Sequence, residues 1–568
     1  MNPATRWAEI FVQGLAAAGI DTVCIAPGSR STPLTAAFSA HPDFRVFSHL
    51  DERSAAFFAL GRALVTGKPT PIVCTSGTAA ANFFPAVIEA STSQVPMLIL
   101  TADRPPELRH TGANQTIDQI KLFGEYVRWF VDMPLPETTA DARTLRSLSS
   151  TAARAVARSM DSPPGPVHLN FPFRKPLEPN HPAQSYPIHT PVILANPRDP
   201  STEQIEFTAE LVRQYPNGLI FCGPRPAASP DFPQAVAALS RATGFPLVAD
   251  VLSDLRFGPH TRHAPPHNPA ILPHLPASDL VIQFGGAPVS KAALTFFEQT
   301  PAKRIAVHPH GTFWDEHHQL DGMIAAEPTA FCDGVNAALT GRHIPDNSVI
   351  NSAAARAEAE YWGAVDVIAA QIEFEGLLLA NAAALMPPNS QLFVANSLPI
   401  RHLDAYARPH ANPLSIFANR GVSGIDGTVS SALGAASGSK QPTALITGDL
   451  SFYHDMNGLL AVHRGGVPIT IVVINNNGGG IFRRLPIAQH DPPFTDLFLT
   501  PHGLTFAPAA EMYGLRYVHV NTSNDFANAF RDAVGNVPTL IEVTTDSTVD
   551  ENARRQIAAA FAQSRAQS

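Results

Sequence analysis

Short β-branched runs alternate with helical patterns along this 568-residue chain, and this alternation limits the folds that it can adopt more than any other feature. The first series has expected strands at 22–26, 45–50, 71–75 and 96–101, and it closes with the run GPVHLNFP at 165–172. Strands that alternate with helices form parallel sheets covered by helices on both faces. The first third of the chain is therefore expected to be a doubly wound α/β domain.

A proline-rich stretch at 176–202 follows and lacks hydrophobic periodicity, so we expect a linker there. A second series of strands is then expected at 218–223, 245–251, 278–286 and 303–309. The region 341–352 is polar and irregular and leads into an Ala- and Glu-rich helix. This region separates the second series from a third one.

The third series has expected strands at 391–397, 442–449, 468–476 and 538–546. No fixed-period repeat of the solenoid kind is present. We therefore predict an α/β protein with three doubly wound parallel-sheet domains, spanning 1–180, 190–345 and 355–568. Ligands in such sheets bind beyond the carboxyl ends of the strands.

The overall charge favours small-molecule chemistry. Lys and Arg number 39 against 48 Asp and Glu, a net charge of −9, which offers no basic face for nucleic acid or anionic membranes. The apolar runs are shorter than the roughly 20 residues of a membrane span, and the N-terminus lacks the basic leader of a signal peptide. The four cysteines lie far apart, as buried thiols in a reducing cytosol would. A soluble, cytoplasmic protein is expected.

Polar residues at two neighbouring strand ends indicate a cation site. Gly448 and Asp449 close one expected strand, and the run NNNGG at 475–479 closes the next. Mg²⁺ prefers oxygen ligands, which the Asp449 carboxylate, the Asn476 amide and the main-chain carbonyl of Gly478 can supply. The glycines would let the backbone approach a diphosphate closely.

Each half of this pattern alone is more often a helix cap or an ordinary turn. Together, a Gly-Asp pair followed by Asn-Asn after one helix and one strand is typical of thiamine diphosphate enzymes. We therefore expect the three doubly wound domains to be of the thiamine diphosphate-dependent enzyme type. Leu450 stands where such enzymes usually have a further glycine, a difference that removes no ligand.

Glu52 lies at the junction between the run 45–50 and the helix that follows. In thiamine enzymes a glutamate bonds N1′ of the aminopyrimidine and promotes the imino tautomer that removes the C2 proton. The alternative is an acid in the first helical turn that favours the helix dipole. Ser76, Gly77 and Thr78 open another helix and are candidates for pyrimidine or phosphate contacts. Ile425 is a candidate for the apolar wedge that bends the cofactor, or else a buried residue at a helix start.

Six longer stretches carry a more specific signal than the metal motif: IAPGSRSTPL (25–34), HLDERSAAFFALGRA (49–63), TSGTAAANFFPAVIEA (75–90), LTADRPPELRHTGANQTI (100–117), FANRGVSGIDG (417–427) and NNNGGGIFRRLP (475–486). Together they resemble the 2-succinyl-5-enolpyruvyl-6-hydroxy-3-cyclohexene-1-carboxylate synthase (SEPHCHC synthase, MenD) family. The match covers both outer domains, whereas the middle domain agrees in strand order and little else.

The resemblance implies an enzyme of menaquinone biosynthesis that decarboxylates 2-oxoglutarate and adds the remaining unit to isochorismate. It implies thiamine diphosphate with Mg²⁺ or Mn²⁺, and a homodimer or homotetramer in which the cofactor lies between the first domain of one subunit and the third domain of another. Catalysis is then assigned to Glu52. Further cofactor contacts are implied for Gly448, Leu450, Ser451, Gly479, Ile481 and Phe482.

The resemblance also assigns the substrate contacts. Arginine suits carboxylates because its planar fork can bond them bidentately. The isochorismate side is assigned to Ser29, Arg30, Arg104, Asn114, Gln115 and Lys291, and the succinyl side to Ser397, Arg401 and Arg420. The family often has Lys-Arg where this chain has Lys291-Ala292, so one cation is either missing or supplied from elsewhere.

Two competing interpretations remain at this point. Another thiamine enzyme, such as an acetolactate synthase or a 2-oxo acid decarboxylase, would keep Glu52 and the metal motif but need fewer cations. A non-catalytic dinucleotide-binding protein would need a GxGxxG motif after the first strand of a domain, which this sequence lacks.

Overall fold

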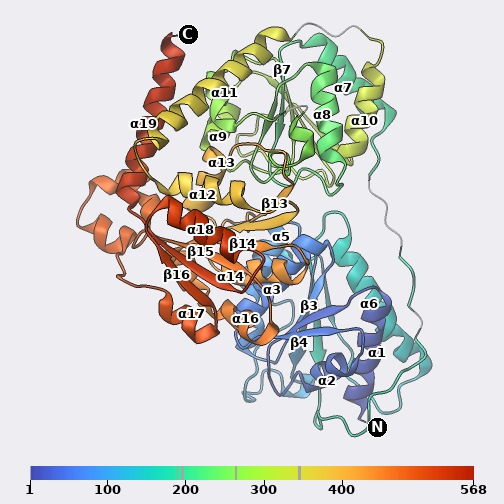
Figure 1. The fold of residues 1–568 in the computed structure, drawn as a ribbon. Coiled ribbons are helices and arrows are strands. Elements are labelled where there is room, and N and C mark those ends of the chain that lie inside the picture. The colour runs from blue at the N-terminus through green and yellow to red at the C-terminus, as the bar shows by residue number, and fades with distance from the viewer. Residues whose placement is uncertain (1, 189, 194–197, 263–264, 343–346, 568) are drawn as a thin grey trace.

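The computed structural model describes residues 2–188, 190–193, 198–262, 265–342 and 347–567. The described chain forms three parallel sheets of six, five and six strands, each flanked by helices (Figure 1). In Figure 1 the first sheet lies in the blue and cyan part, the second in the green part, and the third in the yellow to red part. The predicted class, three parallel-sheet α/β domains, is confirmed.

The first sheet has the strand order β2-β1-β3-β4-β6-β5. Apolar side chains of α1, α2 and α6 pack on one face of this sheet, and those of α3, α4 and α5 pack on the other. The strands are β1 (Thr22–Ile25), β2 (Arg45–Ser48), β3 (Thr70–Cys74), β4 (Met97–Asp103), β5 (Trp129–Asp132) and β6 (Pro166–Pro172). The helices are α1 (Pro3–Ala17), α2 (Thr32–Ala40), α3 (Glu52–Thr66), α4 (Thr78–Asn82), α5 (Phe84–Thr92) and α6 (Ala142–Met160).

The second sheet has the order β11-β10-β9-β7-β8. Helices α7, α8 and α10 cover one face, and α9 packs on the other. The strands are β7 (Gly218–Cys222), β8 (Leu247–Ala249), β9 (Leu280–Phe284), β10 (Lys303–His308) and β11 (Gly322–Ala325). The helices are α7 (Thr202–Gln214), α8 (Phe232–Thr243), α9 (Lys291–Gln299) and α10 (Pro328–Leu339).

The third sheet, ordered β13-β12-β14-β15-β17-β16, repeats the strand order of the first. Its strands are β12 (Ser390–Val394), β13 (Leu414–Phe417), β14 (Thr443–Gly448), β15 (Thr470–Asn475), β16 (Arg516–Val520) and β17 (Thr539–Thr544). Its helices are α11 (Ser348–Ala369), α12 (Glu375–Leu385), α13 (Leu398–Tyr406), α14 (Thr428–Ser437), α15 (Asp449–His454), α16 (Leu460–Gly465), α17 (Ala507–Tyr513), α18 (Ser523–Ala533) and α19 (Ser547–Gln567), with the short helix η6 (Gly480–Arg484).

Each predicted strand run overlaps an observed strand, but four strands of the described chain were not predicted: β5, β11, β13 and β16. The prediction of an irregular region at 341–352 is wrong for its last residues, because α11 already begins at Ser348 with Asn347 at its N-cap position. Residues 343–346 of that region lie outside the described residues.

The expected linker at 176–202 has neither helix nor strand in its described part until α7 begins at Thr202. Its first part is held to α1, since the Asn2 amide donates to the carbonyls of Pro176 and Glu178. Residues 189 and 194–197 of the linker lie outside the described residues.

Helices α3 and α14 join the first and third sheets into one apolar core, and they lie side by side at the centre of Figure 1. Two glycines permit this close approach. A Cβ at Gly61 would overlap the carbonyl oxygen of Ser431, and one at Gly434 would overlap that of Phe58. The two outer domains of one chain are thereby fixed against each other.

None of the described helices combines the length and hydrophobicity that crossing a bilayer requires.

Candidate active site

A cavity of about 300 Å³ opens at the carboxyl ends of β12, β14 and β15. In the third sheet β12 lies between β13 and β14, so the chain leaves β12 and β14 in opposite directions at this point. Such a switch point is where open α/β sheets bind ligands. The cavity is lined by many residues expected at the site: Ser397, Arg401, Ile425, Gly448, Asp449, Leu450, Ser451, Asn476, Gly478, Gly479, Ile481 and Phe482.

Asp449 and the Asn-Gly turn meet at one end of this cavity. The Asp449 carboxylate accepts hydrogen bonds from the backbone of Leu450 at 2.6 Å and of Gly478 at 2.9 Å, and His502 Nε2 lies 3.1 Å away. Burial raises the pKa of Asp449, and these hydrogen bonds oppose the effect. Two carboxylate oxygens offer about four lone pairs, so Asp449 keeps one for a cation.

Asn476 shows a free oxygen at the same place. Its Nδ2 donates to Glu375 Oε1 at 2.9 Å, and Thr545 donates to the same oxygen at 2.8 Å. Asn476 Oδ1 is buried and has no hydrogen-bond partner among the described residues. Because Glu375 accepts from the amide nitrogen, the amide oxygen is turned away from it. The donor set of Asp449, Asn476 and the Gly478 carbonyl therefore fits a hard cation such as Mg²⁺.

Arg401 brings positive charge into the cavity. Its Nη1 donates to the carbonyl of Ser397 at 2.7 Å, and it has no carboxylate partner in the described part of the chain. Burial lowers the pKa of Arg401, and the charges of Arg420 and Arg484 lower it further. Arg420 donates to Asn396 Oδ1 at 2.8 Å, and Asn396 itself lines the cavity. Three neighbouring guanidinium groups favour an anionic ligand.

At the wall of the cavity, Glu375, His402 and Asp550 form a buried cluster whose spacing suits a metal ion, and Glu375 and His402 line the cavity. A guanidinium already supplies positive charge there, because Arg484 Nη2 lies 2.9 Å from His402 Nε2 and 3.7 Å from Asp550. We therefore interpret the cluster as the support of Asn476 and Arg484. The sequence analysis did not identify Glu375, His402, Arg484 or His502.

The expected first-domain residues lie beyond the carboxyl ends of strands of the first sheet. Arg30 is buried and donates to the carbonyl of Phe173, while Arg104 donates to the carbonyl of Asn114 at 2.8 Å. Ser76 and Gln115 exchange two hydrogen bonds of 3.0 Å. Gln119 accepts from Gly77 N at 3.0 Å and was also missed by sequence reasoning. Thr78 begins α4.

Glu52 begins α3 behind the N-cap residue Asp51, as expected for a strand-to-helix junction. Its carboxylate forms no hydrogen bond or ion pair with any residue in the described ranges. Ser29 is exposed, and Lys291 is exposed at the first position of α9. None of these first-domain residues, nor Lys291 or Arg420, lines the cavity of the same chain.

Comparisons with known proteins agree with this arrangement. Residues 5–122 match the family described as thiamine pyrophosphate enzyme, N-terminal TPP binding domain, and residues 403–543 match its C-terminal TPP binding domain. Residues 206–394 match the middle domain of thiamine pyrophosphate enzymes.

Curated relatives extend over nearly the whole chain. The 2-succinyl-5-enolpyruvyl-6-hydroxy-3-cyclohexene-1-carboxylate synthase of Roseiflexus sp. (strain RS-1) is 47% identical over 96% of each chain. The chain belongs to the SEPHCHC synthase family. The synthase of Halobacterium salinarum is 44% identical over 98% of each chain. The likeness to SEPHCHC synthases thus includes the middle domain, which the sequence motifs did not reach.

Among solved structures, benzoylformate decarboxylase from Polynucleobacter necessarius superposes with a TM-score of 0.72 at 16% identity, covering 96% of this chain and 99% of that one. At this identity the likeness concerns the fold. The SEPHCHC synthase relatives favour the main interpretation over the two competing ones, an acetolactate synthase or similar thiamine enzyme and a dinucleotide-binding protein.

Proposed function

We propose that the protein is a SEPHCHC synthase of menaquinone biosynthesis, which decarboxylates 2-oxoglutarate and joins the remaining four-carbon unit to isochorismate. The observation that carries the proposal is the third-domain cavity, which combines oxygen ligands at Asp449 and Asn476 with Arg401, an arginine lacking a carboxylate partner. The names of the curated relatives support the same reaction.

The cofactor set of the proposal is thiamine diphosphate with Mg²⁺ or Mn²⁺. When bound, thiamine diphosphate supplies the electron sink for decarboxylation. Asp449, Asn476 and the Gly478 carbonyl would hold the metal. The remaining cofactor contacts would come from the other lining residues: Ile425, Gly448, Leu450, Ser451, Gly479, Ile481 and Phe482. Ser76, Gly77 and Thr78 would contact the cofactor from the first domain.

Glu52 is the proposed catalytic residue, and its carboxyl group would hold a proton at N1′ of the aminopyrimidine when the cofactor is bound. Its carboxylate is free of protein partners in the described chain, so it remains available for that bond. General acid-base groups commonly contribute about 10²- to 10⁴-fold to a rate.

The two substrates are dianions, and the proposal divides the cations between them. Ser397, Arg401 and Arg420 would bind the succinyl portion. Isochorismate would be bound by Ser29, Arg30, Arg104, Asn114, Gln115 and Lys291. Burial lowers the pKa of Arg30, and the charge of Arg104 lowers it further. This crowding of positive charge favours a ligand with carboxylates.

A homodimer, or a homotetramer built from it, would complete each site with the first domain of a second subunit. Glu52 and the first-sheet residues do not line the cavity of their own chain. Leu50, two residues before Glu52, is 64% exposed, and Val422 and Leu485 beside the site arginines are exposed as well. Exposed apolar side chains next in sequence to proposed site residues support a protein interface at both domains.

The proposed domains span 1–180, 190–345 and 355–568. A cytoplasmic location is part of the proposal, supported by four free and buried cysteines.

Metal removal tests the proposal. Protein stripped with EDTA should lose isochorismate consumption and regain it with Mg²⁺ or Mn²⁺. Asp449→Ala should bind thiamine diphosphate and metal more weakly in calorimetry, with partial rescue at high concentrations of both. Undiminished turnover after metal removal, or unaltered cofactor affinity in folded Asp449→Ala, would contradict the assignment.

A further inference from the structure

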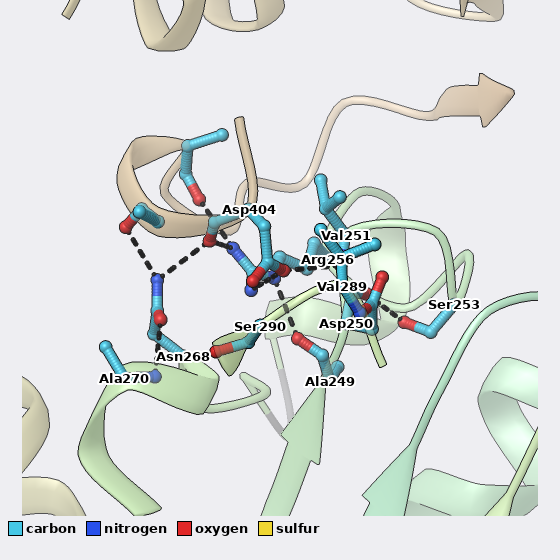
Figure 2. A network of polar contacts seen from close by, with 12 residues as sticks. Ala249, Asp250, Val251, Ser253, Arg256, Asn268, Ala270, Val289, Ser290 and Asp404 are labelled. Atoms are coloured by element: carbon cyan, nitrogen blue, oxygen red, sulfur yellow. Dashed lines mark hydrogen bonds and ion pairs between the residues drawn. The ribbon is translucent and has the colours of Figure 1, made fainter. Parts of the chain in front are cut away.

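A buried polar network joins the second sheet to helix α13 of the third domain (Figure 2). At its centre is Arg256, which is 1% exposed. Its Nη2 donates to Asp404 Oδ1 at 2.8 Å and its Nη1 to the Asp404 carbonyl at 2.6 Å, whereas its Nε donates to the carbonyl of Ala249 at 2.9 Å. Asp404 Oδ1 also accepts from Val251 N at 3.0 Å. Arg256 and Asp404 thus fix α13 to the end of β8.

Asp250 extends this network to the start of α9. Its carboxylate accepts from Leu252 N at 2.9 Å and from Val289 N at 2.7 Å. Figure 2 shows Val289 beside Asp250, and Ser290 in the same cluster. Lys291 follows directly as the first residue of α9, exposed and without a hydrogen bond or ion pair to any residue that the structure describes.

The network also reaches the cations at the cavity. Burial lowers the pKa of Arg420, and the negative charges of Asp250, Glu89 and Asp404 oppose that effect, so Arg420 lies near both carboxylates of the network. Arg401 precedes Asp404 by three residues, about one turn of α13, and lines the cavity. The network is therefore bonded to Val289, two residues before Lys291, and to α13, which carries Arg401, and its carboxylates lie near Arg420.

Stability alone does not explain this arrangement. Asp250 and Asp404 are two buried carboxyl groups, and burial raises the pKa of both. The negative charge of Asp404 raises the pKa of Asp250 further. Well-packed apolar residues are often as stabilising as buried ionic groups. Directional bonds to Val251 and Val289, in contrast, define a geometry that apolar contacts would not.

We propose that Asp250, Arg256 and Asp404 are positioning residues that hold the Val289–Lys291 segment at a fixed place relative to Arg401 and Arg420, so that Lys291 can bind the acceptor substrate. This inference rests on the proposed function for the identity of that substrate, isochorismate. Ala292 follows Lys291, where the family often has a second cation. Lys291 is then the one cation that this position offers, so binding depends on where Lys291 is held.

A double-mutant cycle tests the proposal. Asp250→Ala removes the acceptor of Val289 N, and we expect the KM for isochorismate to rise about 10- to 100-fold, since small misplacements of binding groups have effects of that order. The pre-steady-state rate of 2-oxoglutarate decarboxylation should change by a smaller factor than this KM. Lys291→Ala should give a similar KM, and the double variant should be no worse than Lys291→Ala alone, because both changes remove the same contact.

Asp254→Asn is the matched control, since Asp254 lies on the same loop and is exposed. It should leave KM unchanged. Asp250→Asn keeps one acceptor oxygen and should give an intermediate KM, which maintains the test if Asp250→Ala does not fold. Additive effects of Asp250→Ala and Lys291→Ala, or an unchanged KM in folded Asp250→Ala, would overturn the proposal.

Hydrogen exchange separates this proposal from the proposed function. Backbone amides of 289–294 should exchange faster in Asp250→Ala than in the wild type, and Asp254→Asn should leave them unchanged. Unaltered exchange would refute the positioning role. If the wild-type protein did not consume isochorismate, the proposed function would fail, whereas the exchange result would still decide whether Asp250 positions this segment.

Discussion

Replacing Glu375 by leucine removes the acceptor that orients the Asn476 amide, and we predict that this change weakens metal binding. Glu375 is 2% exposed and lies at the start of α12, outside the proposed ligand set. Its Oε1 accepts from Asn476 Nδ2 at 2.9 Å, which leaves Oδ1 as the free oxygen. Without this bond the amide can rotate and present its nitrogen to the cation.

The size of the effect follows from that single contact. A hydrogen bond to a charged group contributes about 1.5–3 kcal/mol, and each 1.4 kcal/mol is about a factor of ten in affinity. Loss of a partner that orients a metal ligand commonly reduces metal affinity about 10- to 100-fold. We therefore expect the Kd for Mg²⁺ to rise by about one to two orders of magnitude in Glu375→Leu.

Calorimetric titration of Mg²⁺ in the presence of thiamine diphosphate measures this change. Glu375→Gln retains an acceptor oxygen and should stay within about threefold of the wild type. Glu373→Ala is the matched control, because Glu373 is an exposed acid two residues earlier that accepts from Ser523 N. Wild-type Mg²⁺ affinity in a folded Glu375→Leu protein would refute the orienting role.

Three further predictions follow from the site and the core. Glu52→Gln should keep cofactor and metal but slow C2 proton exchange, followed by NMR in D₂O, by about 10²- to 10⁴-fold; exchange at the wild-type rate would remove Glu52 from the mechanism. Arg401→Ala should narrow the preference for 2-oxoglutarate over pyruvate, since a desolvated carboxylate without its arginine commonly costs about 2–5 kcal/mol. Arg30→Ala should instead impair isochorismate use. An unchanged ratio of 2-oxoglutarate to pyruvate turnover in Arg401→Ala would contradict this division of the cations. Burial raises the pKa of Asp455 from 3.8 to about 6, so its stabilising contribution is complete below pH 3.8 and is lost as pH rises through 6. The Tm of Asp455→Asn minus that of the wild type should therefore increase between pH 4 and 7. A Tm difference that does not depend on pH would contradict the raised pKa of Asp455.

The central strands could be predicted from the sequence, and several edge strands could not. Strands such as β3, β9 and β15 are paired on both sides and buried along their whole length, so they read as continuous apolar runs. The missed strands β5, β11, β13 and β16 each lie at an edge of a sheet. An edge strand pairs on one side and is partly exposed, as in β5 and β16, so its sequence lacks that signal.

The candidate site divides in a similar way. Asp449 and Asn476 could be predicted to meet because strand ends in a parallel sheet share one edge. Glu375 could not be linked to Asn476, since α12 reaches it through tertiary packing and an acid in the first turn of a helix is common for other reasons. Arg256 and Asp404, far apart in sequence and in different domains, carry no local pattern at all.

The stoichiometry of one reaction tests the central claim most directly. Purified protein with thiamine diphosphate and Mg²⁺ is given 2-oxoglutarate and isochorismate, and carbon dioxide release and isochorismate consumption are measured together. A SEPHCHC synthase should release one carbon dioxide for each isochorismate consumed and form the succinyl-enolpyruvyl-hydroxycyclohexene carboxylate. Carbon dioxide release from 2-oxoglutarate or pyruvate with isochorismate left unconsumed would contradict the account.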